Sequence, residues 1–430
     1  MFTVAYLANE FPAAVEPYVV QEIREFQRRG IRIIPGTVRS PHNCQSPLGE
    51  HETYEKIVCL EKAGIIVFVR ALVLCARRWK QIAALTWELL FENKELPIRR
   101  LKTLLHTFLG ACYAVSLQDQ DVSHIHVHHG YFGSWVAMVA ARLLGVSFSM
   151  TLHGSDLLLR SAYLGAKLEH CLFCVTISDF NRHYILDHFP AIPPEKILVS
   201  RLGVDASQDG VRAHKYFTNS ISIFSFATVG RLHKVKDHEF LIRACIRLRD
   251  RGLVFRCLVG GEGPERSHLE SLIRKNRLEK WVMLLGHVPR EEISSFYRTV
   301  DVVVLTSRSE GIPLVLMEAM AQGTTVLAPA ITGIPELVIP GKTGFLYSPG
   351  SLDDFTKKIS FLHKLISTEG KSGVSRLDWV RHAALTQVAH NFNRSKNLTH
   401  FADQFLKRLA TNISCHNRSS PNADPILQQI

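Results

Sequence analysis

Two glutamates enclose the almost wholly apolar run SEGIPLVLMEAM at residues 309–320. Glu310 and Glu318 could serve as the acid and base of a hydrolase, as a pair that binds one ligand, or as unrelated surface charges. Pro313 suits the first turn of a helix, where its missing N–H costs no hydrogen bond. Both carboxylates then lie near the positive end of that helix, which also attracts phosphates. The apolar neighbours of Glu318 demand a polar partner for its carboxylate.

Basic and glycine-rich residues follow two other expected strands. The strand at 224–229 continues as GRLHKVKD, in which Arg231 offers a forked donor and Lys236 a point charge. The glycine before them lets the backbone approach a ligand, so this loop suits a diphosphate. A basic turn between a strand and a helix is the plain alternative. The next strand ends in GGEGP at 260–264, a second flexible loop. Carboxylates beside a diphosphate would accept hydrogen bonds from vicinal sugar hydroxyls.

Histidines and further acidic residues provide alternatives. His124, His126 and His128 alternate along the strand HIHVH and share one face, which makes a zinc protein conceivable. The spacing places no carboxylate or cysteine to complete that cluster. The sequence DQD at 119–121 imitates a DxD metal motif, but it stands in a polar loop before a strand. The CLFC at 171–174 lacks the second CxxC of a zinc site.

Strand-like apolar runs alternate with helical patterns through most of the chain, which is the signature of α/β folds with parallel sheets. The expected strands of a first series are 3–7, 32–37, 124–128, 147–152 and 173–177. Those of a second series are 221–229, 255–259, 282–284, 302–305 and 325–328. Because doubly wound sheets bind ligands at the carboxyl ends of their strands, the motifs above stand at the expected edges.

Composition limits the kinds of partner. The chain has 430 residues, 46% of them apolar, which suits two or three domains of ~100–200 residues each. Its formal charge of +12 favours a nucleic acid, an acidic membrane surface or a phosphorylated substrate. No interleaved aromatic and basic motif is present, so we expect no nucleic-acid partner. Nine cysteines at irregular spacing indicate reduced thiols in the cytoplasm.

An apolar segment in the first half raises the question of a membrane. The stretch AGIIVFVRALVLCA at 63–76 is interrupted by Arg70 and is shorter than the ~20 residues that a span needs. Basic residues flank it and recur as far as position 102. These features suit equally a helix on an anionic bilayer surface and a buried helix with a solvated basic flank. The N-terminus, MFTVAYLANEFP, reads as a first strand rather than a signal peptide.

The order and spacing of the motifs in the second half resemble the nucleotide-sugar domain of family-4 retaining glycosyltransferases. This resemblance lies within about 221–412 and is carried by GR with Lys236, GEGP, LGHV, Glu310 with Glu318, TGIPELV and GKTGFL. The first half is similar to bacterial exopolysaccharide transferases of the colanic-acid type. That similarity rests on Phe11-Pro12, Glu16, Val19, Glu22-Ile23, HIHVH, AARLLG, TLHGSDL and TIS.

The resemblance implies a GT-B fold, in which two Rossmann-like, doubly wound α/β domains face a central cleft. The expected divisions are an acceptor-binding domain at 1–203, a linker at 204–220, a nucleotide-sugar-binding domain at 221–390, a helix at 391–412 that braces the first domain, and a disordered tail at 413–430. The linker and the tail are expected because both segments are polar and poor in apolar periodicity.

The resemblance also implies roles for individual residues, with Glu310 and His153 nearest to the reaction. The implied site residues are Arg231 and Lys236 for the donor diphosphate; Glu318 for the ribose; Glu310, the backbone of Gly311 and Ile312, and His153 from the other domain for the donor sugar; His287 and Val288 beside the base; and Asp156 on the acceptor side. Many relatives have a glycine at the position of Pro313, whose missing N–H removes one possible donor to the sugar.

The implied reaction transfers a sugar from a nucleoside-diphosphate sugar to a saccharide acceptor with retention of anomeric configuration. Arg231, Lys236 and a helix N-terminus would stabilise the charge on the leaving diphosphate, so no metal or other cofactor and no side-chain nucleophile are expected. The implied acceptor is a lipid-linked saccharide at the cytoplasmic face of the inner membrane. A retaining glycoside hydrolase with Glu310 and Glu318 ~5–5.5 Å apart is the main rival. The basic pair argues against it, because a hydrolase has no diphosphate to bind.

Overall fold

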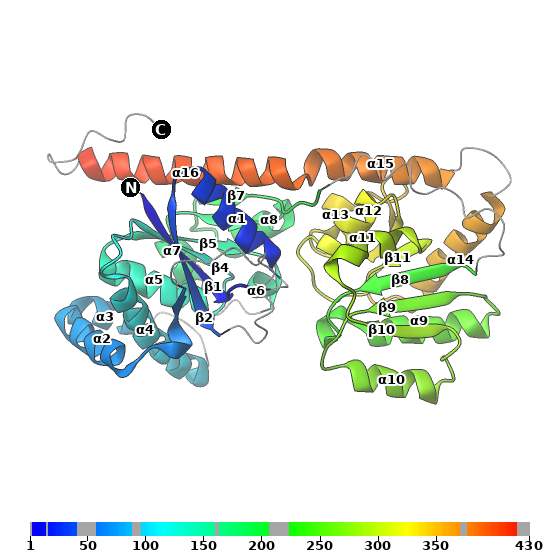
Figure 1. Cartoon of the computed structure of the whole chain (residues 1–430), viewed down its shortest axis with the longest axis horizontal. Helices are drawn as coiled ribbons and strands as arrows, with labels where there is room; N and C mark the ends of the chain where they lie inside the picture. Colours follow the sequence, from blue (N-terminus) through cyan, green and yellow to red (C-terminus); the bar gives the residue numbers. More distant parts are fainter. Residues whose placement is uncertain are drawn as a thin grey trace. The chain divides into compact units, whose positions relative to one another are not determined.

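The computed structural model describes residues 2–13, 16–40, 57–87, 96–159, 163–205, 223–369 and 376–418. The chain divides into two compact units, each built on its own parallel sheet (Figure 1). Unit 1 comprises Met1–Thr176, Tyr184–Ser200 and Leu398–Ile430, and unit 2 comprises Ile177–His183 and Arg201–Asn397.

Unit 1 contains a seven-stranded parallel sheet in the order β3-β2-β1-β4-β5-β6-β7. Its strands are β1 (Thr3–Glu10), β2 (Arg32–Arg39), β3 (Val58–Cys59), β4 (His124–His128), β5 (Ser147–Leu152), β6 (Cys174–Thr176) and β7 (Ile197–Val199). Its helices are α1 (Pro17–Arg28), α2 (Ile65–Arg77), α3 (Trp79–Trp87), α4 (Pro97–Leu117), α5 (Phe132–Leu144), α6 (Ser155–Leu158), α7 (Leu164–His170) and the second half of α8 (Asp179–His188). The strand order reverses between β1 and β4, which makes this edge a topological switch point.

The unit 1 sheet has a core on each face. Along β1, Tyr6 packs in one core with Phe26 of α1, whereas Leu7 packs in the other core with helices α4 and α5. Successive side chains of a strand point to opposite faces, so a strand buried on both faces reads as a continuous apolar run. This is why β1 was recognisable in the sequence as an unbroken run of apolar residues.

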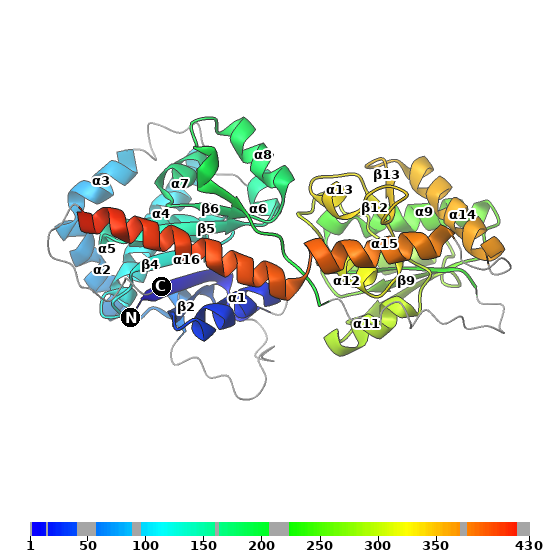
Figure 2. The ribbon, with the colours of Figure 1, turned by 90° about the horizontal axis from the view of Figure 1, so that it is seen from above.

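A long C-terminal helix, α16 (Arg394–Arg418), covers the α1 side of unit 1 (Figure 2). Phe401 and Phe405 are buried against Phe26, with ring centroids 5.7 and 4.8 Å from that ring. The helix begins three residues after the predicted start at 391 and continues beyond 412, so the segment from 413 to 418 is helical instead of disordered. The rest of the predicted tail and most of the predicted linker lie outside the described residues.

Unit 2 contains a six-stranded parallel sheet in the order β10-β9-β8-β11-β12-β13. Its strands are β8 (Ser225–Val229), β9 (Arg256–Gly260), β10 (Val282–Gly286), β11 (Val302–Val304), β12 (Thr325–Pro329) and β13 (Phe345–Tyr347). Its helices are α9 (His238–Asp250), α10 (Arg266–Lys275), α11 (Arg290–Arg298), α12 (Leu314–Ala321), α13 (Ile334–Leu337), α14 (Leu352–Glu369) and α15 (Arg376–Asn391). Two cores again cover opposite faces, with Phe226 of β8 in one and Ala227 in the other.

All ten strands expected from the sequence are present in the structure. Three further strands were not predicted, namely β3, β7 and β13, which are only two or three residues long. A run this short does not establish a period of two residues, so pattern reading has no signal to use.

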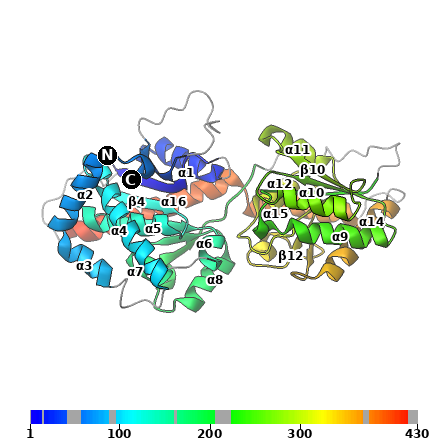
Figure 3. The same ribbon diagram turned by 90° about the horizontal axis from the view of Figure 1, so that it is seen from below.

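Helix α4 packs beside α5 on the unit 1 sheet, and α2 and α3 lie on the outer side of α4 (Figure 3). Of the residues of α2, Ala71 alone is buried, while Ile65 and Ile66 are 77% and 72% exposed. The alternative of a buried helix at 63–76 is therefore wrong. Among the described residues, none of the helices combines the length and the apolar character needed to cross a bilayer.

Candidate active site

The carboxyl end of the unit 2 sheet carries the glycine-rich and basic loops. Gly230 follows β8, and its N–H donates a 2.9 Å hydrogen bond to the carbonyl of Gly260 at the end of β9. Gly261 has a φ of +135°, and a Cβ added there would lie 1.9 Å from the carbonyl oxygen of Gly230. Only glycine permits this approach. The two loops predicted after separate strands therefore contact each other.

Arg231 and Lys236, the predicted diphosphate ligands, differ in their surroundings. Arg231 is exposed, and no described residue forms a hydrogen bond or an ion pair with its guanidinium. Lys236 Nζ donates a 2.5 Å hydrogen bond to Glu310 Oε1, and these side chains are 27% and 12% exposed. The predicted diphosphate lysine and the predicted sugar glutamate thus form a largely shielded ion pair. Spacing did not predict this contact, because the two residues come from different loops.

The TGIPE motif at 332–336 packs on the loop that contains Glu310. Thr332 Oγ1 donates a 2.6 Å hydrogen bond to the carbonyl of Glu310. A Cβ added to Gly333 would lie 2.9 Å from the carbonyl oxygen of Gly311. The same Cβ would lie 2.9 Å from Ile312 Cγ1. This close packing fixes the backbone at the two positions predicted to contact the donor sugar.

Helix α12 presents Glu318 a little more than one turn after its start. Pro313 is the N-cap, and the helix begins at Leu314, one residue later than predicted. Glu318 is half-buried, and its Oε2 accepts a 3.3 Å hydrogen bond from the hydroxyl of Tyr297 in α11. Burial raises the pKa of Glu318, although the Tyr297 hydroxyl and two nearby arginines oppose the shift. Tyr297 is therefore the polar partner that was expected for Glu318 in its apolar surroundings.

The hydrolase alternative required Glu310 and Glu318 to act as one carboxylate pair. The structure gives them separate partners, Lys236 for the first and Tyr297 for the second. No hydrogen bond joins the two carboxyl groups within the described part of the chain. The structure therefore does not support Glu310 and Glu318 as the acid and base that act on one glycosidic bond.

His287 and Val288, predicted beside the base, follow β10 at the same edge of the unit 2 sheet. Val288 Cγ2 lies 2.8 Å from the position of a Cβ added to Gly260. Val288 therefore packs on the glycine loop that ends β9. His287 is exposed at the end of the strand.

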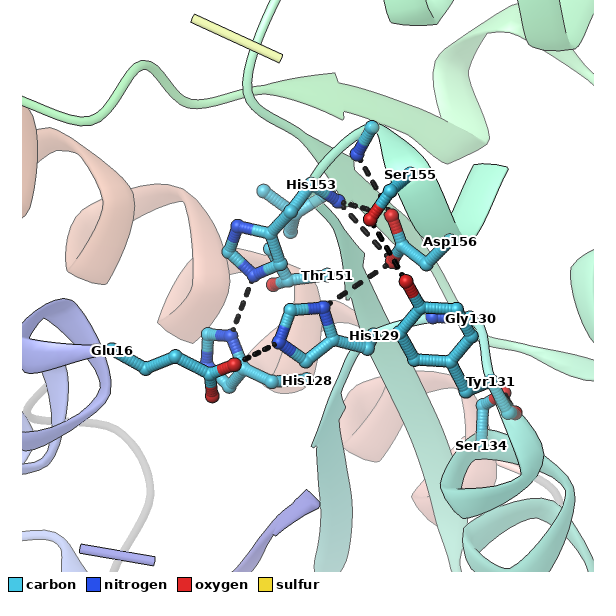
Figure 4. A network of polar contacts seen from close by, with 12 residues as sticks. Glu16, His128, His129, Gly130, Tyr131, Ser134, Thr151, His153, Ser155 and Asp156 are labelled. Carbon is cyan, nitrogen blue, oxygen red and sulfur yellow. Dashed lines mark hydrogen bonds and ion pairs between the residues drawn. The ribbon is translucent and has the colours of Figure 1, made fainter. Parts of the chain in front are cut away.

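A histidine network occupies the carboxyl edge of the unit 1 sheet, beside the switch point between β1 and β4 (Figure 4). His128 ends β4, His129 follows it, and His153 follows β5. His128 Nδ1 lies 3.0 Å from His153 Nε2. His129 Nε2 lies 2.8 Å from Oε1 of Glu16, the residue before α1. The predicted sugar ligand His153 is thus part of a connected group of rings and carboxylates.

Asp156, predicted on the acceptor side, is fully buried in the structure. Its carboxylate accepts hydrogen bonds of 2.8, 3.0 and 2.8 Å from the backbone N–H groups of Gly130, His153 and Gly154. Burial opposes the charge on this carboxylate, but His129 and the backbone donors lower the pKa of Asp156 well below its ordinary value. Asp156 fixes the backbone on both sides of His153 and does not present its own oxygens to an acceptor.

His129 is a buried cation between two carboxylates. Its Nδ1 lies 3.7 Å from Asp156 Oδ2, and its other nitrogen bonds Glu16. Burial opposes protonation, but Asp156 and Glu16 together raise the pKa of His129 to about 10. The pKa of His153 is lowered well below its ordinary value, first by burial and then by the charge of His129. His153 is therefore neutral at pH 7.

The zinc-protein alternative joined His124, His126 and His128 of β4, but in the structure the rings of His124 and His126 are hydrogen-bonded to the neighbouring strand. Both ring nitrogens of His124 lie within 2.8 Å of serine hydroxyls of β5. His126 contacts a serine and a threonine of β5 at 2.8 and 3.0 Å. Because these nitrogens already have partners, the alternation along β4 reflects a hydrogen-bonded core. Within the described ranges, the one group with metal-ligand proximity is Glu22, His126 and His128, with ligand atoms inside 4.8 Å.

The DQD sequence at 119–121 lies at the end of the unit 1 sheet opposite to the histidine network. It precedes β4, so it stands at the amino end of the sheet, whereas the histidine network stands at the carboxyl end. Asp119 is 3.8 Å from Arg70 in a surface ion pair. Cys171 and Cys174 of the CxxC sequence are buried free thiols.

Comparison with known protein families agrees with the geometry of both units. The profile described as "Glycosyl transferases group 1" matches residues 224–368. The profile described as "Glycosyltransferase Family 4" matches residues 15–208. The chain belongs to the family-4 glycosyltransferases. The first profile covers all six strands of the unit 2 sheet, and the second covers the unit 1 sheet except β1, so the matches include the candidate site residues in both units.

Curated relatives point to polysaccharide synthesis. The chain is 34% identical over 208 residues to the putative colanic acid biosynthesis glycosyltransferase WcaL of Escherichia coli, covering 47% of this chain and 49% of the relative. It is 30% identical over 237 residues to the amylovoran biosynthesis glycosyltransferase AmsK of Erwinia amylovora, covering 52% and 57%. The chain thus spans about half the length of the curated relatives that it matches.

Solved structures share the fold. A glycosyltransferase from Rickettsia africae matches with a TM-score of 0.66 and 18% identity over 95% of this chain and 98% of that chain. Anabaena HepE in complex with UDP matches with a TM-score of 0.65 and 15% identity over 95% and 100%. These matches and the two parallel sheets confirm the two-domain α/β fold of the GT-B type that the sequence predicted.

Three contacts of the candidate site were not anticipated. They are the ion pair of Lys236 with Glu310, the Tyr297 hydroxyl on Glu318, and the carboxylates around the histidines. The last had a signal in the sequence. Glu22 falls within the apolar stripe of α1, where a buried carboxylate requires a partner.

Proposed function

We propose that this protein transfers a sugar from a nucleoside-diphosphate sugar to a saccharide acceptor, with retention of anomeric configuration. The observation that carries this proposal is the Lys236–Glu310 ion pair beside the exposed Arg231, at the carboxyl edge of the unit 2 sheet. Two cationic side chains and the glycine-rich backbone suit a diphosphate, and the Glu310 carboxylate, in direct contact with Lys236, suits sugar hydroxyls. Structures of similar fold contain UDP, or UDP with glucose, which supports this class of donor.

The proposed roles of the unit 2 residues follow from their contacts. The diphosphate of the donor carries more negative charge than a single carboxylate, so it is the stronger partner for Lys236. Arg231 has room to form a bidentate contact with the diphosphate. Glu310 is then available to accept hydrogen bonds from the sugar, beside the backbone of Gly311 and Ile312. Glu318 accepts hydrogen bonds from the ribose.

The leaving diphosphate gains negative charge as the bond to the sugar breaks. Arg231, Lys236 and the N-terminal end of α12 stabilise that charge, which lowers the barrier without requiring a metal. The remaining roles that we propose are sugar contact by His153 and base contact by His287 and Val288. A leaving diphosphate oxygen takes the proton of the acceptor hydroxyl, so no side-chain nucleophile is assigned.

A donor screen tests the proposal. We expect UDP, GDP or ADP, or one of their sugars, to raise the melting temperature of the wild-type protein and to bind in calorimetry. The variants Arg231→Ala and Glu318→Ala should weaken that binding about tenfold or more, because each removes a contact to a charged or buried group. Asp353→Ala, at an exposed position of α14, serves as the control. The proposal fails when no nucleotide stabilises or binds the wild type.

We also propose that the acceptor is lipid-linked and that the protein binds the cytoplasmic face of the inner membrane as a peripheral protein. The relatives named for colanic acid and amylovoran biosynthesis support an exopolysaccharide pathway. The outer surface of α2, α3 and α4 supports the membrane contact, and we call it the apolar surface. Its exposed large apolar residues are Ile65, Ile66, Val69, Leu72, Val73, Trp79, Trp87, Leu96, Ile98, Leu101 and Leu105.

The charge of this surface matches an anionic bilayer. Lys62, Arg77, Arg78 and Lys80 flank α2, and neither α2, α3 nor α4 contains an acidic residue. Exposed apolar side chains can insert into a bilayer interface, and cationic neighbours are attracted to anionic lipid headgroups. A large apolar patch exposed to water is unusual in a soluble monomer and indicates a binding surface.

Vesicle flotation tests the membrane contact. The wild type should float with vesicles that contain anionic phosphatidylglycerol and remain with the soluble fraction when the vesicles are pure phosphatidylcholine. Ile66→Ser/Leu72→Ser should reduce flotation, while Val254→Ser, an equally exposed apolar position in unit 2, should not. Equal flotation of both variants, or no flotation of the wild type, refutes the proposed contact.

A further inference from the structure

A continuous line of hydrogen-bonding groups runs from α1 to His153 through the core of unit 1. Glu22 Oε2 lies 3.0 Å from His128 Nε2, and His128 Nδ1 lies 3.0 Å from His153 Nε2 (Figure 4 shows the second contact). The side chain of His128 is fully buried and that of Glu22 is 9% exposed. Solvent therefore does not compete for these contacts.

The carboxylate end of this line determines which nitrogen of His128 carries a hydrogen. The hydroxyl of Tyr6 donates to Glu22 Oε2, and burial together with the charge of Glu22 raises the pKa of Tyr6 well above its ordinary value. Glu22 is thus an acceptor from both neighbours, because a carboxylate has no hydrogen to donate. His128 Nε2 must then carry the hydrogen that lies between His128 and Glu22.

Two arrangements remain for the contact between His128 and His153. In the first, His128 is neutral, its Nδ1 accepts, and His153 carries its hydrogen on Nε2. In the second, His128 is doubly protonated and donates to His153, whose hydrogen then lies on Nδ1. The second arrangement places a cation on His128 with its ring centroid 6.5 Å from that of protonated His129. Complete burial of His128 and the charge of His129 both oppose this cation, and only the carboxylate of Glu22 favours it, so we take the first arrangement.

We propose that Glu22 and His128 are positioning residues that fix the tautomer of His153, so that its Nδ1 accepts a hydrogen bond from a hydroxyl of the transferred sugar. This inference rests on the proposed glycosyltransferase function for the identity of the ligand. The tautomer itself follows from the geometry of unit 1 alone.

The ring of His153 is also fixed in orientation, so that the free nitrogen has one direction. Tyr18 and His129 pack against it, with ring centroids 4.7 and 4.6 Å away. No described residue bonds to His153 Nδ1, which points away from His128 in Figure 4. An acceptor with fixed direction and no internal partner is the arrangement expected of a ligand contact.

Histidine nitrogen shifts test the tautomer without any substrate. In protein labelled with ¹⁵N-histidine, the signals of His153 are assigned by their loss in His153→Gln. We expect a hydrogen-bearing Nε2 and a bare Nδ1 in the wild type. In Glu22→Leu, the Tyr6 hydroxyl, 3.1 Å from His128 Nε2, becomes its donor, and the hydrogens of His128 and His153 move to their Nδ1 atoms. Glu22→Gln keeps an acceptor oxygen and should retain the wild-type pattern.

A matched control separates this effect from general damage to the core. Ser149→Ala removes a hydroxyl that bonds both His124 and His126 on the same strand but touches neither Glu22 nor His128. It should leave the His153 signals in place. The proposal is overturned when wild-type His153 carries its hydrogen on Nδ1, or when Glu22→Leu folds with the wild-type tautomer.

Kinetics then connect the tautomer to the reaction. Glu22→Leu should lower kcat/KM for the nucleotide sugar about tenfold, the size of one lost hydrogen bond in the transition state, while the affinity for the free nucleotide stays unchanged. Adding Glu22→Leu to His153→Ala should cause no further loss, because both changes remove the same contact. If no nucleotide binds to the wild type or to any variant, the proposed function is refuted, but the tautomer result is unaffected. Additive losses refute the positioning role.

Discussion

The buried cation His129 predicts a specific dependence of stability on pH. Its pKa is about 10 in the folded state against 6.5 for an ordinary histidine. A raised pKa contributes stability that is fully present below the unfolded value and is lost as the pH rises toward the folded value. At 1.36 kcal/mol for each pKa unit, unit 1 should lose roughly 4 kcal/mol between pH 7 and pH 10 through this residue.

The variant His129→Gln isolates this contribution. Glutamine carries no charge and keeps an amide that can donate to Glu16, and it has no advantage over histidine at the positive φ of 71°. Any cost of backbone strain is therefore the same in both proteins. The wild type should be more stable at pH 7, and the difference in unfolding free energy should shrink by roughly 4 kcal/mol by pH 10.

Urea denaturation measures this difference when the signal comes from unit 1 alone. Trp135 is buried in α5, next to β4, and reports on unit 1 when the other four tryptophans are replaced by phenylalanine. Both proteins need this background, because two units need not unfold in one step. Parallel stability curves for the wild type and His129→Gln would refute the reasoning, as would an NMR titration in which His129 loses its proton near pH 6.5.

Three further substitutions, two of them paired with a comparison variant, test other parts of the structure by urea denaturation. Gly261→Ala should cost unit 2 about 3 kcal/mol or more, because the added Cβ meets a backbone oxygen at 1.9 Å, whereas Gly350→Ala, in open space at a φ of +71°, should cost about 1–2 kcal/mol. Phe405→Ala should cost unit 1 about 3–5 kcal/mol by removing a buried ring. Arg29→Ala should cost about 1 kcal/mol, because one of its carboxylate partners, Asp403, is 58% exposed and the other, Glu25, is an i,i+4 neighbour on α1. Glu318→Gln should stabilise unit 2 at pH 7, since burial raises the pKa of Glu318 and disfavours its charged form, yet weaken nucleotide binding in calorimetry.

The sheets were predictable from the sequence because their central strands, such as β1, β4 and β5, are buried on both faces. Strands such as β4 and β5 have the residue bounds that the apolar runs predicted. The exposed face of α2 was not predictable, because a helix buried in a core and a helix on a bilayer surface are both rich in apolar residues. Burial is decided by what packs on the helix, and that information lies elsewhere in the chain.

The site was predictable in its residue types but not in its pairings. Loops after β8 and β11 were expected at one edge of a sheet, and they do lie together there. Which side chains touch depends on strand order and on loop conformation, which spacing along the chain does not encode. For this reason Lys236 and Glu310 were assigned separate ligands, although they form an ion pair with each other.

The two units differ in how readily their charges can change partners. Asp156 accepts three backbone hydrogen bonds and has no exposed surface, so a ligand would have to break several contacts to reach it. Lys236 and Glu310 share one hydrogen bond and remain 27% and 12% exposed. A diphosphate can replace Glu310 on the lysine and lose little, because the charge of each group is satisfied before and after. The unit 2 pair is therefore suited to exchange with a ligand, whereas the unit 1 network is suited to hold His153 in one orientation.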